Sequence, residues 1–217
     1  MKKPGGGRLL KLIDLSHPIE NNMPVYPGDE RPRVEQIKWL ASDYHNNHRL
    51  ATAMHVGTHV DAPSHMLGRG QTISELPITA FVGRGVLLDV RGEEEVEWKP
   101  AYEEKIPSDS IVVLYTGHSK YYRQTEYFTN HPTVTLDFAE HLISKKIKML
   151  GMDLPSPDLP PFPVHKKLLA NGIYILENLT NLAALGGHLN FMMIALPLKL
   201  HTDGSPVRAV AFDYEHG

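Results

Sequence analysis

Three histidines and one aspartate lie within eleven consecutive residues of this chain, in the segment TAMHVGTHVDAPSHM at positions 52–66. They are His55, His59, Asp61 and His65. Imidazole nitrogens and carboxylate oxygens together form a ligand set that suits Zn²⁺, Mn²⁺ or Fe²⁺. The segment therefore predicts a metal site, provided that the backbone brings these side chains to one point.

The backbone of this segment is predicted to be a strand rather than a helix. β-Branched residues alternate with the histidines, Gly57 is flexible and Pro63 follows closely, and these features lower helix propensity. In a strand, every second residue shares one face, which here runs from His55 to Asp61. Gly57 then leaves a hollow between two imidazoles where an ion fits. The alternative is a set of ordinary polar residues on an exposed strand, with Gly57 marking a bulge.

The composition is that of a soluble globular protein. Of 217 residues, 41% are hydrophobic and 22% are charged, and the net charge is −3 without a dense run of Lys or Arg. Nucleic acid is therefore excluded as a partner, because phosphate binding needs a concentrated basic face. The chain has no cysteine, which rules out thiolate chemistry and is compatible with a reducing cytosol. No apolar run approaches the roughly 20 residues of a membrane span, so we expect a cytoplasmic protein without membrane contact.

The chain is predicted to form one α/β domain with more strand than helix. We expect residues 1–7 to be a flexible tail and residues 8–217 to be the single domain. One helix is predicted over 135–146, with Thr135 as its N-cap, and a second over 162–172. Short apolar runs bounded by Gly, Pro and Asp predict buried strands. These runs are 9–16, 85–90, 111–117, 147–153, 172–179, 191–198 and 206–212.

The segment HVGTHVDAPSH resembles the His-x-Gly-Thr-His-x-Asp-x-Pro-x-His signature of the cyclase-like metal hydrolase family, which includes bacterial kynurenine formamidases and isatin hydrolases. Three further segments are similar to the family's N-terminal segment, central loop and C-terminal metal segment. They are DLSHPIENNMPVYPGD (14–29), GMDLPSPD (151–158) and VHKKLLANGIYILENLTNL (164–182). The resemblance implies a swivelling β/β/α-like fold, in which a mixed β-sheet curls into a barrel-like core with peripheral helices. It also implies a homodimer or homotetramer.

The resemblance also implies a two-metal centre. His55, His59 and Asp61 would bind a first metal, and Asp61 would bridge to a second metal held by His165 and Glu177. The expected cofactor is Zn²⁺, two ions per subunit, with Mn²⁺ as an alternative because imidazole and carboxylate ligands accept both. Taken alone, the last two residues have ordinary explanations: His165 lies near a helix start, and Glu177 ends an apolar strand, where a carboxylate needs some partner.

Two further residues receive roles from the resemblance. His65 would be the proton donor and acceptor. Tyr26 occupies the position where kynurenine formamidases carry a substrate-contacting tryptophan, although a loop tyrosine between two prolines can equally be packed for shape. These assignments imply that an activated water attacks an amide carbonyl while His65 protonates the leaving amine.

The expected function is that of an arylformamidase, which converts N-formyl-L-kynurenine to kynurenine and formate in tryptophan catabolism. No serine lies in a Gly-x-Ser-x-Gly motif, which argues against a serine-hydrolase formamidase. One alternative is hydrolysis of a cyclic amide such as isatin. The His165 and Glu177 pair favours the formamidase, whereas Tyr26 in place of tryptophan slightly favours the alternative. A third hypothesis, of another class, is a non-catalytic metal-binding or ligand-sensing protein.

Overall fold

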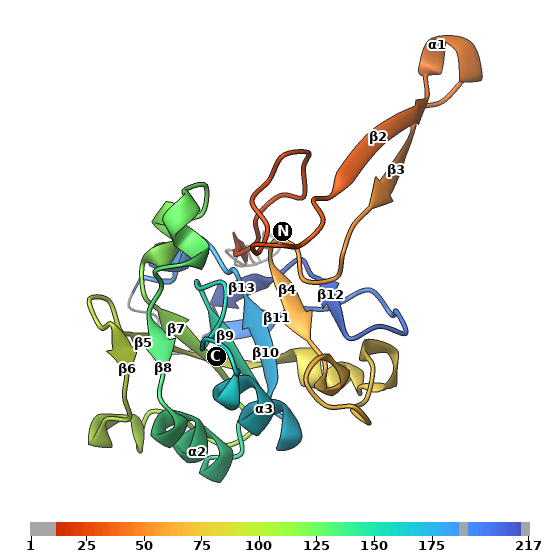
Figure 1. Ribbon diagram of the computed structural model, residues 1–217. Helices are drawn as coiled ribbons and strands as arrows, with labels where there is room; N and C mark the ends of the chain where they lie inside the picture. Colours follow the sequence, from red (N-terminus) through yellow and green to blue (C-terminus); the bar gives the residue numbers. More distant parts are fainter. Residues whose placement is uncertain (1–11, 187–190, 214–217) are drawn as a thin grey trace, which may run out of the picture.

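The computed structural model describes residues 12–186 and 191–213, and the predicted tail at 1–7 lies outside them. One mixed nine-stranded sheet, in the order β1-β13-β11-β5-β7-β9-β10-β4-β12, curls into a half-barrel (Figure 1). Its strands are β1 (Leu12–Asp14), β4 (His59–Asp61), β5 (Val82–Asp89), β7 (Ile111–Tyr115), β9 (Met149–Met152), β10 (Tyr174–Glu177), β11 (Phe191–Ile194), β12 (Gly204–Pro206) and β13 (Val210–Asp213). The predicted α/β fold, with a curled mixed sheet and peripheral helices, is confirmed.

The parallel strands β5, β7, β9 and β10 form the middle of the sheet, and antiparallel strands flank them on both sides. Each of the seven predicted apolar runs contains one strand of this sheet or overlaps it. The run at 206–212 is interrupted, because β12 ends at Pro206 and β13 begins only at Val210.

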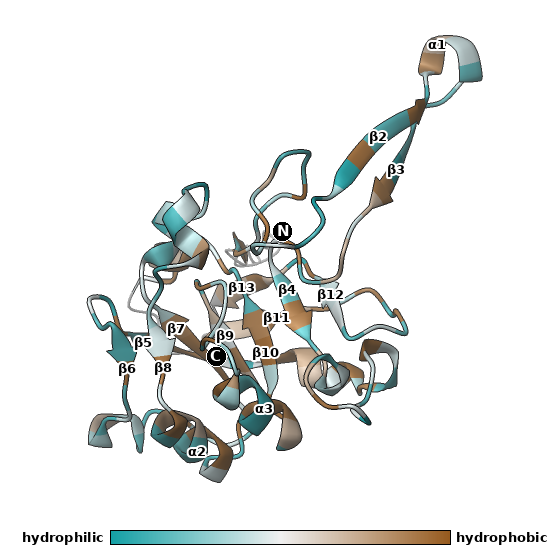
Figure 2. Ribbon diagram, in the orientation of Figure 1, coloured by the Kyte–Doolittle hydropathy of each residue, from teal (hydrophilic) through white to brown (hydrophobic). Residues whose placement is uncertain are grey.

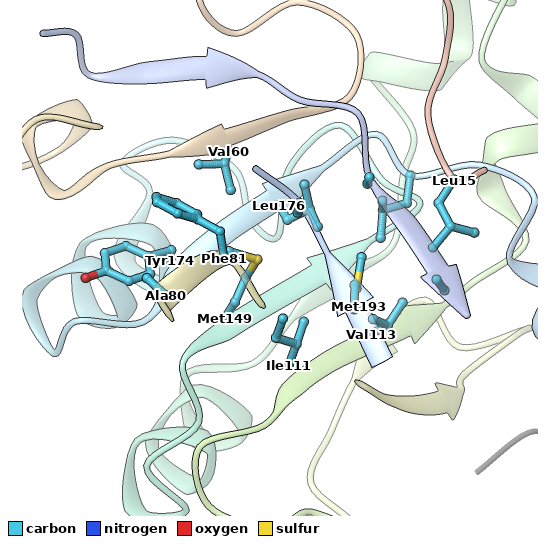
Figure 3. Close-up of a cluster of buried hydrophobic side chains, with 14 of the residues drawn as sticks. Leu15, Val60, Ala80, Phe81, Ile111, Val113, Met149, Tyr174, Leu176 and Met193 are labelled. Carbon is cyan, nitrogen blue, oxygen red and sulfur yellow. The ribbon is translucent and has the colours of Figure 1, made fainter. Parts of the chain in front are cut away.

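The core lies on both faces of the sheet because side chains alternate along its strands. In β7, Ile111 and Val113 belong to the cluster inside the curl, which Figure 3 shows, whereas Val112 and Leu114 face the helices. All four are completely buried. This two-sided burial explains why the central strands are apolar at every position.

Helices α2 (Leu136–Ser144) and α3 (Pro163–Ala170) cover the outer face of the sheet. The predicted N-cap is confirmed, since Thr135 Oγ1 accepts a hydrogen bond from the backbone N–H of Phe138 at 3.1 Å. After α3, Gly172 has φ +71°, the left-handed conformation that commonly ends a helix. No helix within residues 12–186 and 191–213 is long and apolar enough to cross a membrane.

Two small sheets accompany the main one. Strands β6 (Glu95–Val96) and β8 (Thr133–Val134) pair near α2. Strands β2 (Arg33–Lys38) and β3 (Asn47–Ala51), with the short helix α1 (Leu40–Asp43) at their tip, form a hairpin arm that projects from the body (Figure 1). The arm carries apolar as well as polar segments (Figure 2) although its side chains are mostly exposed. Its strands were not among the predicted runs, because charged residues break up their sequence.

Candidate metal centre and pocket

Strand β4 is shorter than predicted. It covers only His59–Asp61, and the chain bends before it, with φ +63° at Gly57. A Cβ atom at Gly57 would lie 3.0 Å from the Cε of Met23, so this glycine approaches Met23 and leaves no hollow between two imidazoles. The prediction of one continuous strand face from His55 to Asp61 is therefore wrong. The bend nevertheless brings His55 back to the same point, with its Nδ1 2.8 Å from Asp61 Oδ1.

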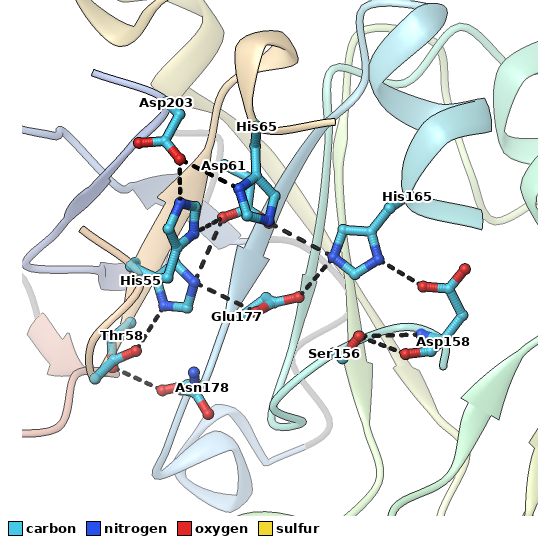
Figure 4. Close-up of polar contacts among 12 residues, drawn as sticks. His55, Thr58, Asp61, His65, Ser156, Asp158, His165, Glu177, Asn178 and Asp203 are labelled. Carbon is cyan, nitrogen blue, oxygen red and sulfur yellow. Dashed lines mark hydrogen bonds and ion pairs between the residues drawn. The ribbon is translucent and has the colours of Figure 1, made fainter. Parts of the chain in front are cut away.

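Pairing of β4 with β10 brings the distant carboxylate to the motif. In the antiparallel register, Glu177 lies opposite His59, and its Oε2 is 3.3 Å from His59 Nε2. Helix α3 supplies His165, whose Nε2 lies 3.1 Å from Glu177 Oε1 and 3.7 Å from Asp61 Oδ2. Asp61 Oδ1 lies 3.4 Å from His59 Nε2, which closes a ring of four side chains (Figure 4). The ring members come from three elements, and each is at most 5% exposed.

The hydrogen bonds of the two ring histidines leave one nitrogen of each directed at the carboxylates. His59 Nδ1 donates to the carbonyl oxygen of Gly57 at 2.8 Å, and His165 Nδ1 donates to Asp158 Oδ1 at 2.5 Å. In the neutral rings, each Nε2 therefore presents a lone pair. Among the described residues, His59 Nε2 and Asp61 Oδ2 are buried without any hydrogen-bond partner.

The lone pairs on Nε2 of these rings and the ionised carboxylates that they face repel each other unless a cation or protons lie between them. A divalent cation satisfies both groups at once, and acceptors that orient the rings through Nδ1–H are typical of metal-ligating histidines. Within the described part of the chain, two groups have donor atoms close enough to share an ion. They are His59, Asp61 and Glu177, and His55, Asp61 and His65. The residues thus suit a metal centre in which Asp61 belongs to both groups.

The pKa shifts of these residues show that positive charge stabilises the centre. Burial alone lowers the pKa of His59, but the adjacent carboxylates of Asp61 and Glu177 raise it to about 10. Burial also lowers the pKa of His165 and of His55, but the carboxylates beside them raise it to about 10 and about 9, respectively. Burial raises the pKa of Asp61, yet the neighbouring imidazoles hold it well below its usual range. Burial and the charge of Asp61 raise the pKa of Glu177, but His165 and His59 lower it below its ordinary value. Both carboxylates therefore stay ionised, and protons on the imidazoles compensate them where no metal does.

His65 lies at the mouth of this centre and has a different environment. It ends the short 3₁₀ turn Pro63–His65, and its side chain is 25% exposed. Asp203 Oδ2 lies 3.4 Å from His65 Nδ1 and 3.0 Å from His55 Nε2, so one carboxylate contacts both rings. Burial lowers the pKa of His65 and its carboxylate neighbours do not reverse the shift, whereas those of the ring histidines do. A neutral imidazole at the edge of the centre is suited to proton transfer.

A cavity of about 230 Å³ opens beside these histidines. Tyr26 lines it and packs edge-to-face against Phe128 with ring centroids 6.0 Å apart. Phe162 also lines it and packs against His165 with ring centroids 5.5 Å apart. None of the described lining residues is Lys or Arg. The pocket therefore offers aromatic surface next to the candidate metal centre.

The predicted residues all meet at this site, and the sequence reasoning missed several of their partners. Asp158 and Asp203 orient histidines, Phe128 and Phe162 line the pocket, and Asn178 follows Glu177 into it. Asp158 and Asn178 carried a signal, because they lie in the segments 151–158 and 164–182 that resemble the family's central loop and C-terminal metal segment. The other partners lie far from the motif in sequence, where spacing gives no indication.

Comparison with known proteins gives one consistent result. Residues 13–159 match the family model described as "Putative cyclase". A kynurenine formamidase of Bacillus thuringiensis (strain Al Hakam) is 33% identical over 204 residues, which cover 91% of this chain and 95% of that protein. Isatin hydrolase A from Labrenzia aggregata, bound to benzyl benzoate, has a TM-score of 0.84 at 28% identity. The match covers 95% of this chain and 94% of the hydrolase chain. A structure described as a potential metal-dependent hydrolase with cyclase activity has a TM-score of 0.79 at 28% identity, and the match covers 95% of this chain and 100% of that chain.

Proposed function

Since the chain belongs to the cyclase family, we propose that this metal-dependent aryl amide hydrolase cleaves N-formyl-L-kynurenine to kynurenine and formate. The observation that carries the proposal is the closed ring of His59, Asp61, Glu177 and His165 beside an aromatic pocket. Hydrolysis of an aryl amide needs both features: a metal centre that binds the amide group, and aromatic side chains that contact the aryl ring. The substrate is thus a small molecule, and the enzyme uses a metal cofactor.

For the cofactor, we propose two Zn²⁺ ions per subunit with Asp61 as the shared ligand, and Mn²⁺ as the alternative. His55, His59, His165 and Glu177 would supply the remaining protein ligands. When bound, such a cation polarises a carbonyl group and lowers the pKa of water. The hydrogen bonds from His59 Nδ1 and His165 Nδ1 support this assignment, because they hold Nε2 of each ring ready for coordination.

The protein's own groups would perform the remaining chemistry. An aryl amine leaves poorly as an anion, so the scissile nitrogen must receive a proton. His65 is our candidate for this transfer, since it lines the pocket and its Nδ1 faces the carboxylate of Asp203. That contact leaves the other ring nitrogen for the substrate. Tyr26 and Phe128 would hold the aryl ring and exclude water from it.

A cyclic amide such as isatin is the second candidate substrate. The small pocket, with aromatic walls and no described Lys or Arg in its lining, suits a neutral bicyclic compound. Such a compound has no carboxylate that would need a cationic partner. Both candidates contain an amide bond directly attached to an aryl ring, so the same centre serves either reaction.

The first test is hydrolysis of N-formyl-L-kynurenine and isatin, followed by absorbance, with protein that has been stripped of metal and reloaded. We expect Zn²⁺ or Mn²⁺ to restore turnover of N-formyl-L-kynurenine, and elemental analysis to find two ions per subunit. Metal loading is also expected to raise the melting temperature, because it compensates two buried carboxylates. Faster turnover of isatin would select the second candidate. Equal turnover with and without metal would contradict the proposal.

We also propose that the enzyme is a cytoplasmic homodimer or homotetramer. The hairpin arm supports an assembly, because a two-stranded ribbon alone is marginally stable and this one exposes several large apolar side chains. At its tip, Trp39 is 53% exposed, Leu40 64% and Tyr44 92%. Apolar surface on this scale typically marks a protein interface.

Light scattering after gel filtration tests the role of the arm. We expect the wild type to elute with two or four times the subunit mass of 24.3 kDa. The combined change of Trp39, Leu40 and Tyr44 to Ser is expected to give monomers, because it removes the apolar tip. Leu159→Ser is the matched control, since Leu159 is a 47% exposed apolar residue outside the arm. A wild-type monomer, or an unchanged mass in the triple variant, would contradict this role.

A further inference from the structure

Two consecutive residues, Glu177 and Asn178, line the same pocket. In a regular strand, successive side chains point to opposite faces, so neighbours cannot do this. Here β10 ends at Glu177, and Asn178 has φ +55°. This left-handed conformation is uncommon for any residue other than glycine, is tolerated best by Asn and Asp, and often occurs at functional sites. The local backbone therefore turns the Asn178 side chain toward the candidate metal centre.

All polar atoms of Asn178 except one form hydrogen bonds with the described residues. Its backbone N–H donates to the carbonyl oxygen of Leu154 at 2.9 Å, and its backbone carbonyl accepts from Thr58 Oγ1 at 2.7 Å. Its side-chain Oδ1 accepts a hydrogen bond from the hydroxyl of Tyr127 at 2.8 Å. The amide nitrogen Nδ2 contacts no partner among the described residues, although Asn178 is only 4% exposed. Two N–H donors are thus unpaired on a residue that lines the pocket.

Tyr127 holds this carboxamide in one orientation, because its own ring is fixed by packing. It is completely buried, stacks on His118 at 5.0 Å and packs edge-to-face on Phe128 at 4.9 Å. Burial raises its pKa well above the usual range, so its hydroxyl stays protonated and donates. The opposite orientation of Asn178 would direct a further oxygen at the site that already holds the carboxylates of Asp61 and Glu177.

From this geometry we infer that Asn178 Nδ2 donates a hydrogen bond to the carbonyl oxygen of the amide substrate, and that Tyr127 is its positioning residue. The inference rests on the proposed amide hydrolysis. As the carbonyl carbon is attacked, its oxygen gains negative charge, and a fixed donor then stabilises the transition state more than the bound substrate. Asn178 would thus be a catalytic residue that acts without exchanging a proton.

Asn178→Gly tests the donor without disturbing the fold, because glycine accepts φ +55° and keeps both backbone hydrogen bonds. We expect kcat to fall about 10²-fold, as on removal of one oxyanion donor, with KM raised by at most about fivefold, the value of one neutral hydrogen bond, and metal content unchanged. Asn178→Asp should lose as much activity, since the isosteric carboxylate cannot donate. Tyr174→Phe, which removes a hydroxyl from the other end of β10, is the control and should retain wild-type kcat.

Tyr127→Phe tests the positioning role. The variant keeps the buried ring but frees the carboxamide, so we expect kcat to fall about fivefold, the value of one neutral hydrogen bond, with unchanged metal content. A fall of less than threefold in Asn178→Gly would overturn the inference. Loss of metal in the Asn178 variants would also overturn it, because Asn178 would then act on the metal rather than on the substrate.

A binding measurement separates this inference from the proposed function. Benzamide contains the aryl group and the amide carbonyl but no formyl group, so its affinity can be measured by calorimetry whether or not turnover occurs. We expect the Kd for metal-loaded protein to rise about fivefold in Asn178→Gly relative to the wild type. If the wild type hydrolysed neither N-formyl-L-kynurenine nor isatin, the proposed function would fail, and equal benzamide affinities would then overturn the inference separately.

Discussion

Replacement of Asp61 by asparagine is expected to release the metal and to lower kcat/KM by at least about 10³-fold, since metal activation contributes several kcal/mol to the transition state. Asp61 is 1% exposed, and three imidazoles approach its two oxygens. Asparagine preserves the shape of the side chain but removes the charge that both donor groups share. The centre would then contain histidines around a neutral amide, which binds a divalent cation weakly.

Elemental analysis and steady-state kinetics on the same preparation check this prediction. Asp89→Asn provides the control, because Asp89 lies on the exposed end of β5 and pairs with Arg91 at 2.7 Å. That variant should retain metal and activity. If Asp61→Asn kept a full metal content, Asp61 would not be the shared ligand, and the ring would have to be assigned another purpose.

His65→Gln is expected to lower kcat about 10²- to 10⁴-fold while metal stays bound, because proton transfer by a positioned side chain contributes that much. Glutamine can still form hydrogen bonds with Asp203 but cannot exchange a proton near neutral pH. The metal content is decisive here. Donor atoms of His55, Asp61 and His65 lie within 4.8 Å of one another, so His65 is also close enough to be a ligand.

The two roles of His65 predict different results. Replacement of a proton-transfer residue leaves metal binding intact, whereas replacement of a ligand releases the metal. His201→Gln is the control, since His201 is exposed and, within the described residues, its ring hydrogen-bonds with the hydroxyls of Thr72 and Ser74, away from the metal centre. Retention of wild-type kcat in His65→Gln would eliminate the proposed role, and loss of metal would assign His65 to the coordination sphere instead.

The local sequence determined those features that depend on near neighbours. Thr135 caps α2 because its hydroxyl meets an N–H only three residues away. The apolar run at 111–115 forms a buried strand because its side chains alternate between two cores. The motif from His55 to His65 predicted a metal site because its ligand types are brought together by a few residues of backbone. The resemblance to a known family added His165 and Glu177, which spacing alone left ambiguous.

Local sequence failed where a distant contact sets the backbone. The segment from His55 to Asp61 has the alternation of a strand, yet Gly57 turns to φ +63° where the chain approaches Met23, more than thirty positions away. Only the first half of the motif was affected. His59 and Asp61 keep the strand relationship, because β4 pairs with β10 there.

Only the tertiary structure decided which groups support the motif. Asp203 meets His65 across 138 positions, and the hydroxyl of Tyr127 meets Asn178 across 51. The first contact arises because β12, which follows Asp203, pairs with β4, which precedes His65, and no periodicity in the chain encodes that pairing. Because buried polar groups must find partners wherever the sheet brings them, the sequence specifies which side chains bind, while strand pairing specifies how they are oriented.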